Sequence, residues 1–191
     1  SSDSGNALTI NNSLGVTVDG CRISGSQKGL VANGSGKISV QNCVVNDANI
    51  GVQVGGSPVN TVRNNTIVNG TVGLQLDAGS SSATILNNLL SGQSSASLVV
   101  NNGAQQWYRG NGNLYNPGSG TAVLLNGTGY SVAQVRDKSL SQAWYNHDKA
   151  DKADPLSRRG GYAAESQSMA FAPVFVNAAG GDFRLSSNLR N

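Results

Sequence analysis

The chain has 191 residues, enough for one domain with a substantial core. Only 12% of its residues are charged, and its net charge of +3 forms no basic stripe or cluster, which argues against a nucleic-acid-binding protein. No apolar run approaches the roughly 18 residues of a membrane-spanning helix.

A six-residue phrase recurs along the first half of the chain. Its copies begin at Val18, Val40, Val62 and Ile85, with spacings of 22, 22 and 23 residues. A fainter copy begins at Trp107, 22 residues further on. A fixed period of this size indicates stacked structural units, each of which needs its neighbours to bury its apolar face.

Apolar and polar residues alternate over short runs within each copy, as in Val16-x-Val18, Ile38-x-Val40, Val52-x-Val54 and Leu74-x-Leu76. This period of two predicts strands with one buried face. Gly, Asn, Ser and Asp separate the runs, as turns require. Each period therefore predicts about three short strands, which pair in parallel with their equivalents one coil away, about 4.8 Å along the axis.

One turn position forms a polar column, occupied by Cys21, Cys43, Asn65, Asn88 and, in the fainter copy, Gly110. Stacked Asn side chains can hydrogen-bond from coil to coil, so we expect Asn65 and Asn88 to form a structural ladder. A disulfide between neighbouring coils would suit a Cα separation of about 4.8 Å. In-register Cβ vectors fit its dihedral angle poorly, so free stacked thiols at Cys21 and Cys43 are the favoured interpretation, and the disulfide stays open.

Glycines at 29, 51 and 73 mark a second bend in step with the first. The outward column between the bends reads Asp19, Gln41, Arg63, Leu86 and Tyr108.

Arg63, with Tyr108 or Arg109, could contact a sugar ring and its carboxylate, which makes these three residues the candidate carbohydrate-binding set. Solvated surface is the alternative. The acids Asp19, Asp47 and Asp77 fall in different columns, so neither a calcium cluster nor a pair of glycosidase carboxylates is predicted.

The last third of the chain differs in composition, because eight of the 13 Lys and Arg residues and six of the 10 acids lie beyond residue 120. Residues 139–145 predict a short helix with Ser139 as its cap. Residues 148–161 predict an exposed charged loop.

The phrase Val62-Arg63-Asn64-Asn65-Thr66-Ile67, followed by Gly73-Leu74-Gln75-Leu76, resembles the pectin-lyase-like superfamily of right-handed parallel β-helices over residues 7–118. The resemblance implies an all-β, single-stranded right-handed parallel β-helix (a solenoid) of about five to six coils with a C-terminal cap. The segments 113–115, 173–176 and 182–185 are similar to the end segments of bacterial secreted β-helix proteins. We therefore expect one domain, 1–191, with coils over 7–118 and an irregular loop, short helix and capping strands over 119–191.

The resemblance also implies a secreted or cell-surface protein of polysaccharide lyase, epimerase or glycosidase type, with a polysaccharide or cell-surface glycan as its partner. Ca²⁺ enters as a cofactor through this resemblance alone. The alternatives are a non-catalytic structural, surface-layer or adhesive β-helix, favoured by the absence of stacked acids, and a glycan-binding accessory module. Whether the chain is an enzyme stays open.

Residues 1–7 form a polar leader that we do not expect to cover the first coil. We expect either another chain to shield that coil or this chain to be the C-terminal part of a longer protein, with the second favoured.

Overall fold

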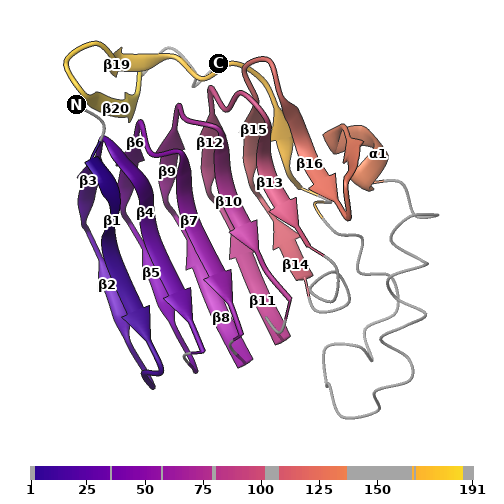
Figure 1. Cartoon of the computed structure of the whole chain (residues 1–191). Helices are drawn as coiled ribbons and strands as arrows, with labels where there is room; N and C mark the ends of the chain where they lie inside the picture. The colour runs from indigo at the N-terminus through magenta and orange to yellow at the C-terminus, as the bar shows by residue number, and fades with distance from the viewer. Residues whose placement is uncertain are drawn as a thin grey trace.

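A computed structural model describes residues 3–34, 36–56, 58–78, 81–101, 108–136, 165 and 167–186. Within these ranges the chain is nearly all β-strand, with one helix, α1 (Val132–Arg136). Figure 1 shows the strands as successive coils that advance from the N-terminus along one axis. The predicted parallel β-helix is confirmed, with about five coils.

Each coil contributes one strand to each of three sheets. Sheet I contains β1 (Asp3–Asn11), β4 (Ser26–Asn33), β7 (Ile50–Gly55), β10 (Val72–Leu76), β13 (Ala96–Val100) and β16 (Thr121–Leu125), with β17 (Thr128–Tyr130) antiparallel at its end. Sheet II contains β2 (Thr17–Asp19), β5 (Ser39–Gln41), β8 (Pro58–Arg63), β11 (Ser81–Leu86) and β14 (Tyr108–Asn111). Sheet III contains β3 (Arg22–Ser24), β6 (Val44–Asn46), β9 (Thr66–Val68), β12 (Leu89–Ser91), β15 (Leu114–Asn116) and β18 (Met169–Ala170).

The core consists of inward rows in which like residues stack on like. Val18 pairs with Val40, Val40 with Val62, and Val62 with Ile85, and all four side chains are buried. The predicted columns are therefore confirmed through the first four coils. The polar residues at the start of the chain join this stack, because β1 begins at Asp3 and pairs in parallel with β4.

The predicted register of the fainter copy is wrong. Gly110, and not Trp107, pairs with Ile85, and Asn111, and not Tyr108, pairs with Leu86. The fifth coil is longer than the 22 or 23 residues of its predecessors, so a search at fixed period shifts its columns by three positions. Trp107 lies outside the described residues.

The glycines at 29, 51 and 73, which the sequence predicts at a second bend, lie within β4, β7 and β10 of sheet I. Their role is close approach between coils. A Cβ on Gly51 would lie 2.4 Å from Ile67 Cγ2 and 2.5 Å from the Gly73 carbonyl oxygen. Any larger residue would push neighbouring coils apart.

The C-terminal segment returns along the outside of the stack. β18 pairs with β15 and adds a strand to sheet III. β19 (Phe175–Asn177) and β20 (Asp182–Leu185) then form an antiparallel hairpin. In Figure 1 this hairpin lies beside sheet III, close to the N-terminus. The predicted helix at 139–145 and the charged loop at 148–161 lie outside the described residues. Within the described ranges, no helix is long and apolar enough to cross a membrane.

Candidate functional site

A ladder of buried amides fixes the bend between sheets II and III. Asn65, Asn88 and Asn113 are at most 2% exposed. Their Nδ2 atoms donate to the carbonyl oxygens of Val40, Val62 and Ile85 at 3.0, 2.9 and 3.0 Å. Their Oδ1 atoms accept from the backbone N–H groups of Cys43, Asn65 and Asn88 at 2.9, 3.1 and 2.9 Å. The ladder satisfies buried backbone groups that a bend leaves without sheet partners.

The two cysteines occupy the same row in the first two coils, and both are free. Cys43 Sγ lies 3.8 Å from the Val18 carbonyl oxygen, the position that amide donors take in later coils. Burial raises the pKa of the Cys43 thiol above its usual value. Cys43 is therefore a weak member of the ladder.

At its other end the row continues from Asn113 to Ser168, and a buried acid, Glu165, lies beside both residues. Glu165 has no exposed surface. Its carboxylate accepts from Asn113 Nδ2 at 3.0 Å, from the Tyr115 hydroxyl at 2.8 Å and from the Ser168 hydroxyl. Burial raises the pKa of Glu165 to about 8, because the charged carboxylate loses its hydration, and the hydrogen bond from Ser168 offsets only part of this rise.

Sequence reasoning missed Asn113 and Glu165, the two residues that meet at this end of the ladder. The ladder member of the fifth coil is Asn113, where the fixed period predicts Gly110. The phrase Asn113-Leu114-Tyr115 matches Asn88-Leu89-Leu90, so a coil of variable length would have revealed it. No comparable signal precedes Glu165, which lies outside the repeats.

The residue before each ladder position has a left-handed backbone. Asn64 and Asn87, with φ of 56° and 54°, occupy this position in the third and fourth coils. Asn adopts this conformation more readily than other non-glycine residues. Both side chains consequently lie on the outer surface at the edge of sheet III, where they line a groove.

The hairpin of β19 and β20 forms the other wall of that groove. Phe183 is 8% exposed and packs in a small apolar cluster with Val68, Leu89 and Leu114 on the outer side of sheet III. Phe175 meets Phe183 edge to face, with ring centroids 5.4 Å apart. Arg22 Nη2, from β3 in the first coil, donates to the Gly181 carbonyl oxygen in the hairpin turn at 2.5 Å.

The groove between hairpin and sheet has a volume of about 690 Å³. Its lining combines guanidinium, amide, carboxylate and apolar groups. The described lining residues are Arg22, Val44, Asn64, Asn65, Thr66, Asn87, Leu89, Gly180, Gly181, Asp182, Phe183, Arg184 and Leu185.

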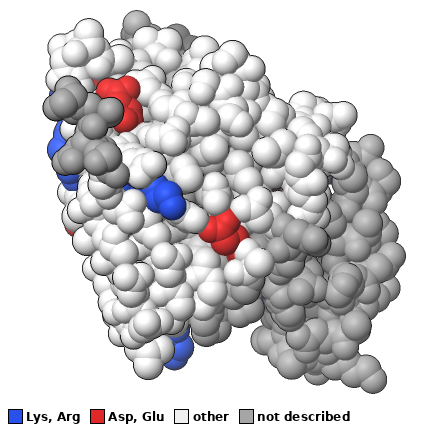
Figure 2. All heavy atoms as spheres, viewed as in Figure 1, with Lys and Arg blue, Asp and Glu red and all other residues white. Residues whose placement is uncertain are grey.

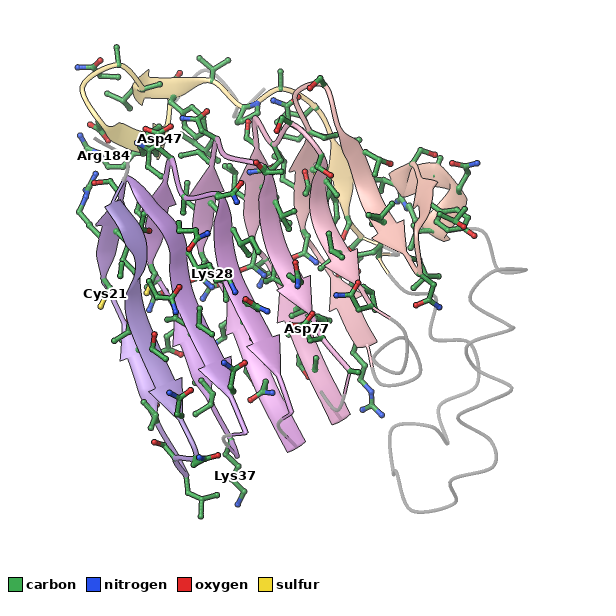
Figure 3. All side chains as sticks on the ribbon, in the orientation of Figure 1. Cys21, Lys28, Lys37, Asp47, Asp77 and Arg184 are labelled. Carbon is green, nitrogen blue, oxygen red and sulfur yellow. The ribbon has the colours of Figure 1, made fainter. Side chains whose placement is uncertain are left out.

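The charged groups among the described lining residues are two guanidinium groups and one carboxylate. Arg184 donates from Nη2 to Asp182 Oδ2 at 2.6 Å and from Nε to Oδ1 at 2.9 Å. These bonds lower the pKa of Asp182 to about 2 and raise that of Arg184. Asp182 therefore stays ionised, and Arg22 leaves the described lining with one excess positive charge. Figure 3 shows Arg184 at the N-terminal end of the stack.

The three residues predicted to bind carbohydrate lie on sheet II, and none is among the described residues that line the groove. Arg63 Nε and Nη2 donate to Gln41 Oε1 at 3.0 and 2.8 Å. Arg63 pairs with Leu86 through its strand, whereas Tyr108 pairs with Ala83 and Arg109 with Thr84. The structure therefore does not place Arg63 in one row with the other two.

The outer face of sheet I carries few charges. Figure 2 shows that most of the visible surface is neither acidic nor basic, and Figure 3 places Lys28 and Asp77 on this side. Asp77 accepts from Gln53 Nε2 at 2.5 Å, Gln75 Nε2 at 2.8 Å and Asn101 Nδ2 at 2.6 Å. These bonds join three coils through one carboxylate.

The described residues do not fit a calcium site. Among them, no three His, Cys, Asp or Glu side chains come together as a group that could hold a metal ion. Calcium sites in proteins need several oxygen ligands, usually with more than one carboxylate.

The comparison with protein families agrees with the fold. The family model described as "Right handed beta helix region" matches residues 1–137, so the chain belongs to the right-handed β-helix family. The resemblance seen in the repeated phrase is thereby confirmed. Comparison with curated proteins and with solved structures gave no match.

Proposed function

We propose that this right-handed β-helix binds an acidic polysaccharide outside the cell or at its surface, with sugar units held in the groove between sheet III and the hairpin. The observation that carries the proposal is the lining of that groove. It sets the guanidinium groups of Arg22 and Arg184 and the amides of Asn64 and Asn87 around one cavity.

Each type of group matches one part of an acidic sugar. The N–H groups of Arg22 and Arg184 that are not bonded to Gly181 and Asp182 can donate to a carboxylate, and one excess positive charge favours a uronate over a neutral sugar. The amides of Asn64 and Asn87 can both donate to and accept from hydroxyl groups. Leu89 and Phe183 offer apolar surface to the C–H face of the ring. A volume of about 690 Å³ falls in the range of about 300–1,000 Å³ typical of ligand sites.

The geometry favours binding over cleavage. Glycoside hydrolysis usually needs two carboxyl groups on either side of the scissile bond. Asp182 is the one carboxylate among the described lining residues, and its ion pair with Arg184 keeps it from acting as an acid. Glu165 has no exposed surface, so it is out of reach of a ligand.

Calorimetric titration with a short uronic-acid oligosaccharide tests the proposal, with the neutral oligosaccharide of the same length as reference. We expect the acidic ligand to bind more tightly, with an affinity that falls as salt rises. Arg184→Gln should weaken binding about tenfold or more, because a charge-assisted hydrogen bond is lost.

Arg63→Gln is the matched control, since it removes another guanidinium group that lies outside the groove. We expect it to leave the affinity unchanged. A loss of affinity confined to Arg63→Gln would move the site to sheet II, and equal binding of acidic and neutral ligands would contradict the proposed charge recognition.

The outer face of sheet I favours a second candidate, a structural or adhesive β-helix without a soluble ligand. Gln53, Gln75 and Leu124 lie in one uncharged row of this sheet, and Figure 2 shows few charges on the face, which could pack against an extended neutral polymer. Sedimentation with insoluble neutral polysaccharide tests this candidate. Asp77→Ala should lower retention if sheet I is the contact face, whereas Arg184→Gln should not.

A further inference from the structure

We propose that Glu165 is a proton-dependent anchor that holds the C-terminal segment, and with it the hairpin wall of the groove, against the fifth coil. The geometry around this residue carries the inference. Glu165 follows no repeat. By register Ser168 takes the next ladder position, and the Glu165 carboxylate beside it accepts the bond from Asn113 Nδ2 that the next amide oxygen would accept. The Glu165 backbone N–H donates to the Gly110 carbonyl oxygen at 2.7 Å.

The anchor joins three parts of the molecule through buried groups. The Glu165 carboxylate is hydrogen-bonded to Asn113 of the ladder, to Tyr115 of β15 and to Ser168, which directly precedes β18. Ser168 Oγ also accepts from the Asn113 backbone N–H at 2.8 Å, and the Met169 N–H donates to the Asn113 carbonyl oxygen at 2.8 Å. The chain continues directly from β18 to the hairpin, so release of this contact would free the base of the hairpin.

No charged group faces the Glu165 carboxylate from the described elements around it. Among these elements, Tyr115 is the titratable partner, and its hydroxyl donates to the carboxylate at 2.8 Å. On β14, Arg109 is the neighbour of Gly110, but it occupies the row of Thr84, which alternates with the buried row of Ala83 and Ile85. The described residues therefore give an ionised Glu165 no counter-ion, whereas the protonated acid can donate to Ser168 Oγ in the same contact.

The direction of the pH effect follows from the pKa of Glu165 in the free and in the docked C-terminal segment. In the free segment the carboxyl has its ordinary pKa of 4.5, and in the docked segment burial raises that pKa to about 8. Docking therefore takes up a proton between these values. The stability that Glu165 confers is complete below pH 4.5 and is lost as the pH rises towards 8.

Two measurements on the ligand-free protein test the anchor. A ¹³C titration of the Glu165 side-chain carboxyl by NMR should give a midpoint near pH 8, and a midpoint near 4.5 would overturn the proposal. Hydrogen exchange of the Met169 amide, corrected for the intrinsic rate, should show protection that falls about tenfold per pH unit within this range.

Glu165→Gln removes the titration and keeps a polar side chain, so it should abolish the pH dependence of Met169 protection. Asp47→Asn is the matched control, because it makes the same charge change at an exposed turn position with φ of 55° that Asn tolerates. The control should keep the dependence of the parent protein. Equal pH dependence in the parent protein and Glu165→Gln would refute the anchor, and the ¹³C titration decides the matter even if that variant fails to fold.

The consequence for the groove rests on the proposed function. Affinity for the uronic-acid oligosaccharide should fall as the pH rises from 4.5 towards 8 in the parent protein and stay level in Glu165→Gln. Absence of binding at every pH would refute the proposed function and leave the exchange result intact, so the two failures are distinguishable.

Discussion

The outer faces of sheets I and III show how differently one coil stack can meet its surroundings. Sheet I has the longer strands, and its surface carries few charged side chains (Figure 2). The strands of sheet III have at most three residues, and the hairpin packs on their outer side through Phe183. The inward-facing rows of sheets I and III are alike in consisting of stacked apolar side chains. The core therefore determines the fold, while the covering segment forms the second wall of the groove, whose excess positive charge comes from Arg22 on β3.

The largest expected effect comes from the amide ladder at the bend between sheets II and III. Asn88→Ala leaves the Val62 carbonyl oxygen and the Asn65 backbone N–H without their partners in a buried row. We expect a loss of about 3–4 kcal/mol in the free energy of unfolding, from two unsatisfied groups and a small cavity. Urea denaturation measures it. A loss below about 1 kcal/mol would show that water replaces the ladder.

Phe183→Ala should separate the two faces. It removes the buried ring that packs on Leu89 and Leu114, so the free energy of opening the hairpin should fall by about 3 kcal/mol. Hydrogen exchange should report faster exchange at the hairpin amides and unchanged protection in sheet I. Equal loss of protection in both regions would contradict independent covering of sheet III.

Asp77→Ala is the counterpart on sheet I. It removes the acceptor shared by Gln53, Gln75 and Asn101, and we expect a cost of about 1 kcal/mol, because these half-buried amides can turn to water. Thermal unfolding measures this cost. Binding of the uronic-acid oligosaccharide should be unchanged, and a weakened affinity would mean that sheet I takes part.

Arg22→Met should have the smallest effect on folding. It keeps an unbranched apolar stem and removes one hydrogen bond to the hairpin turn, so the opening equilibrium of the hairpin should rise about fivefold. Exchange of the Gly181 amide reports this change. The affinity for the acidic ligand should fall together with it, and full affinity would exclude Arg22 from the contact.

The core was predictable because the repeated phrase marks its buried positions. Val18, Val40, Val62 and Ile85 alternate with polar residues at a nearly fixed period, and stacking brings like positions together. Asn113 was missed because its coil is longer than the others. Glu165 and the groove depend on contacts that no local pattern encodes, such as the bond between Arg22 and Gly181, which are 159 residues apart.

Chemical-shift mapping by NMR with the uronic-acid oligosaccharide tests the central claim most directly. The account predicts that the affected backbone amides cluster at Asn64, Asn87 and the hairpin residues from Gly181 to Arg184. Shifts confined to Gln53, Gln75 and Asn101 on sheet I would contradict it.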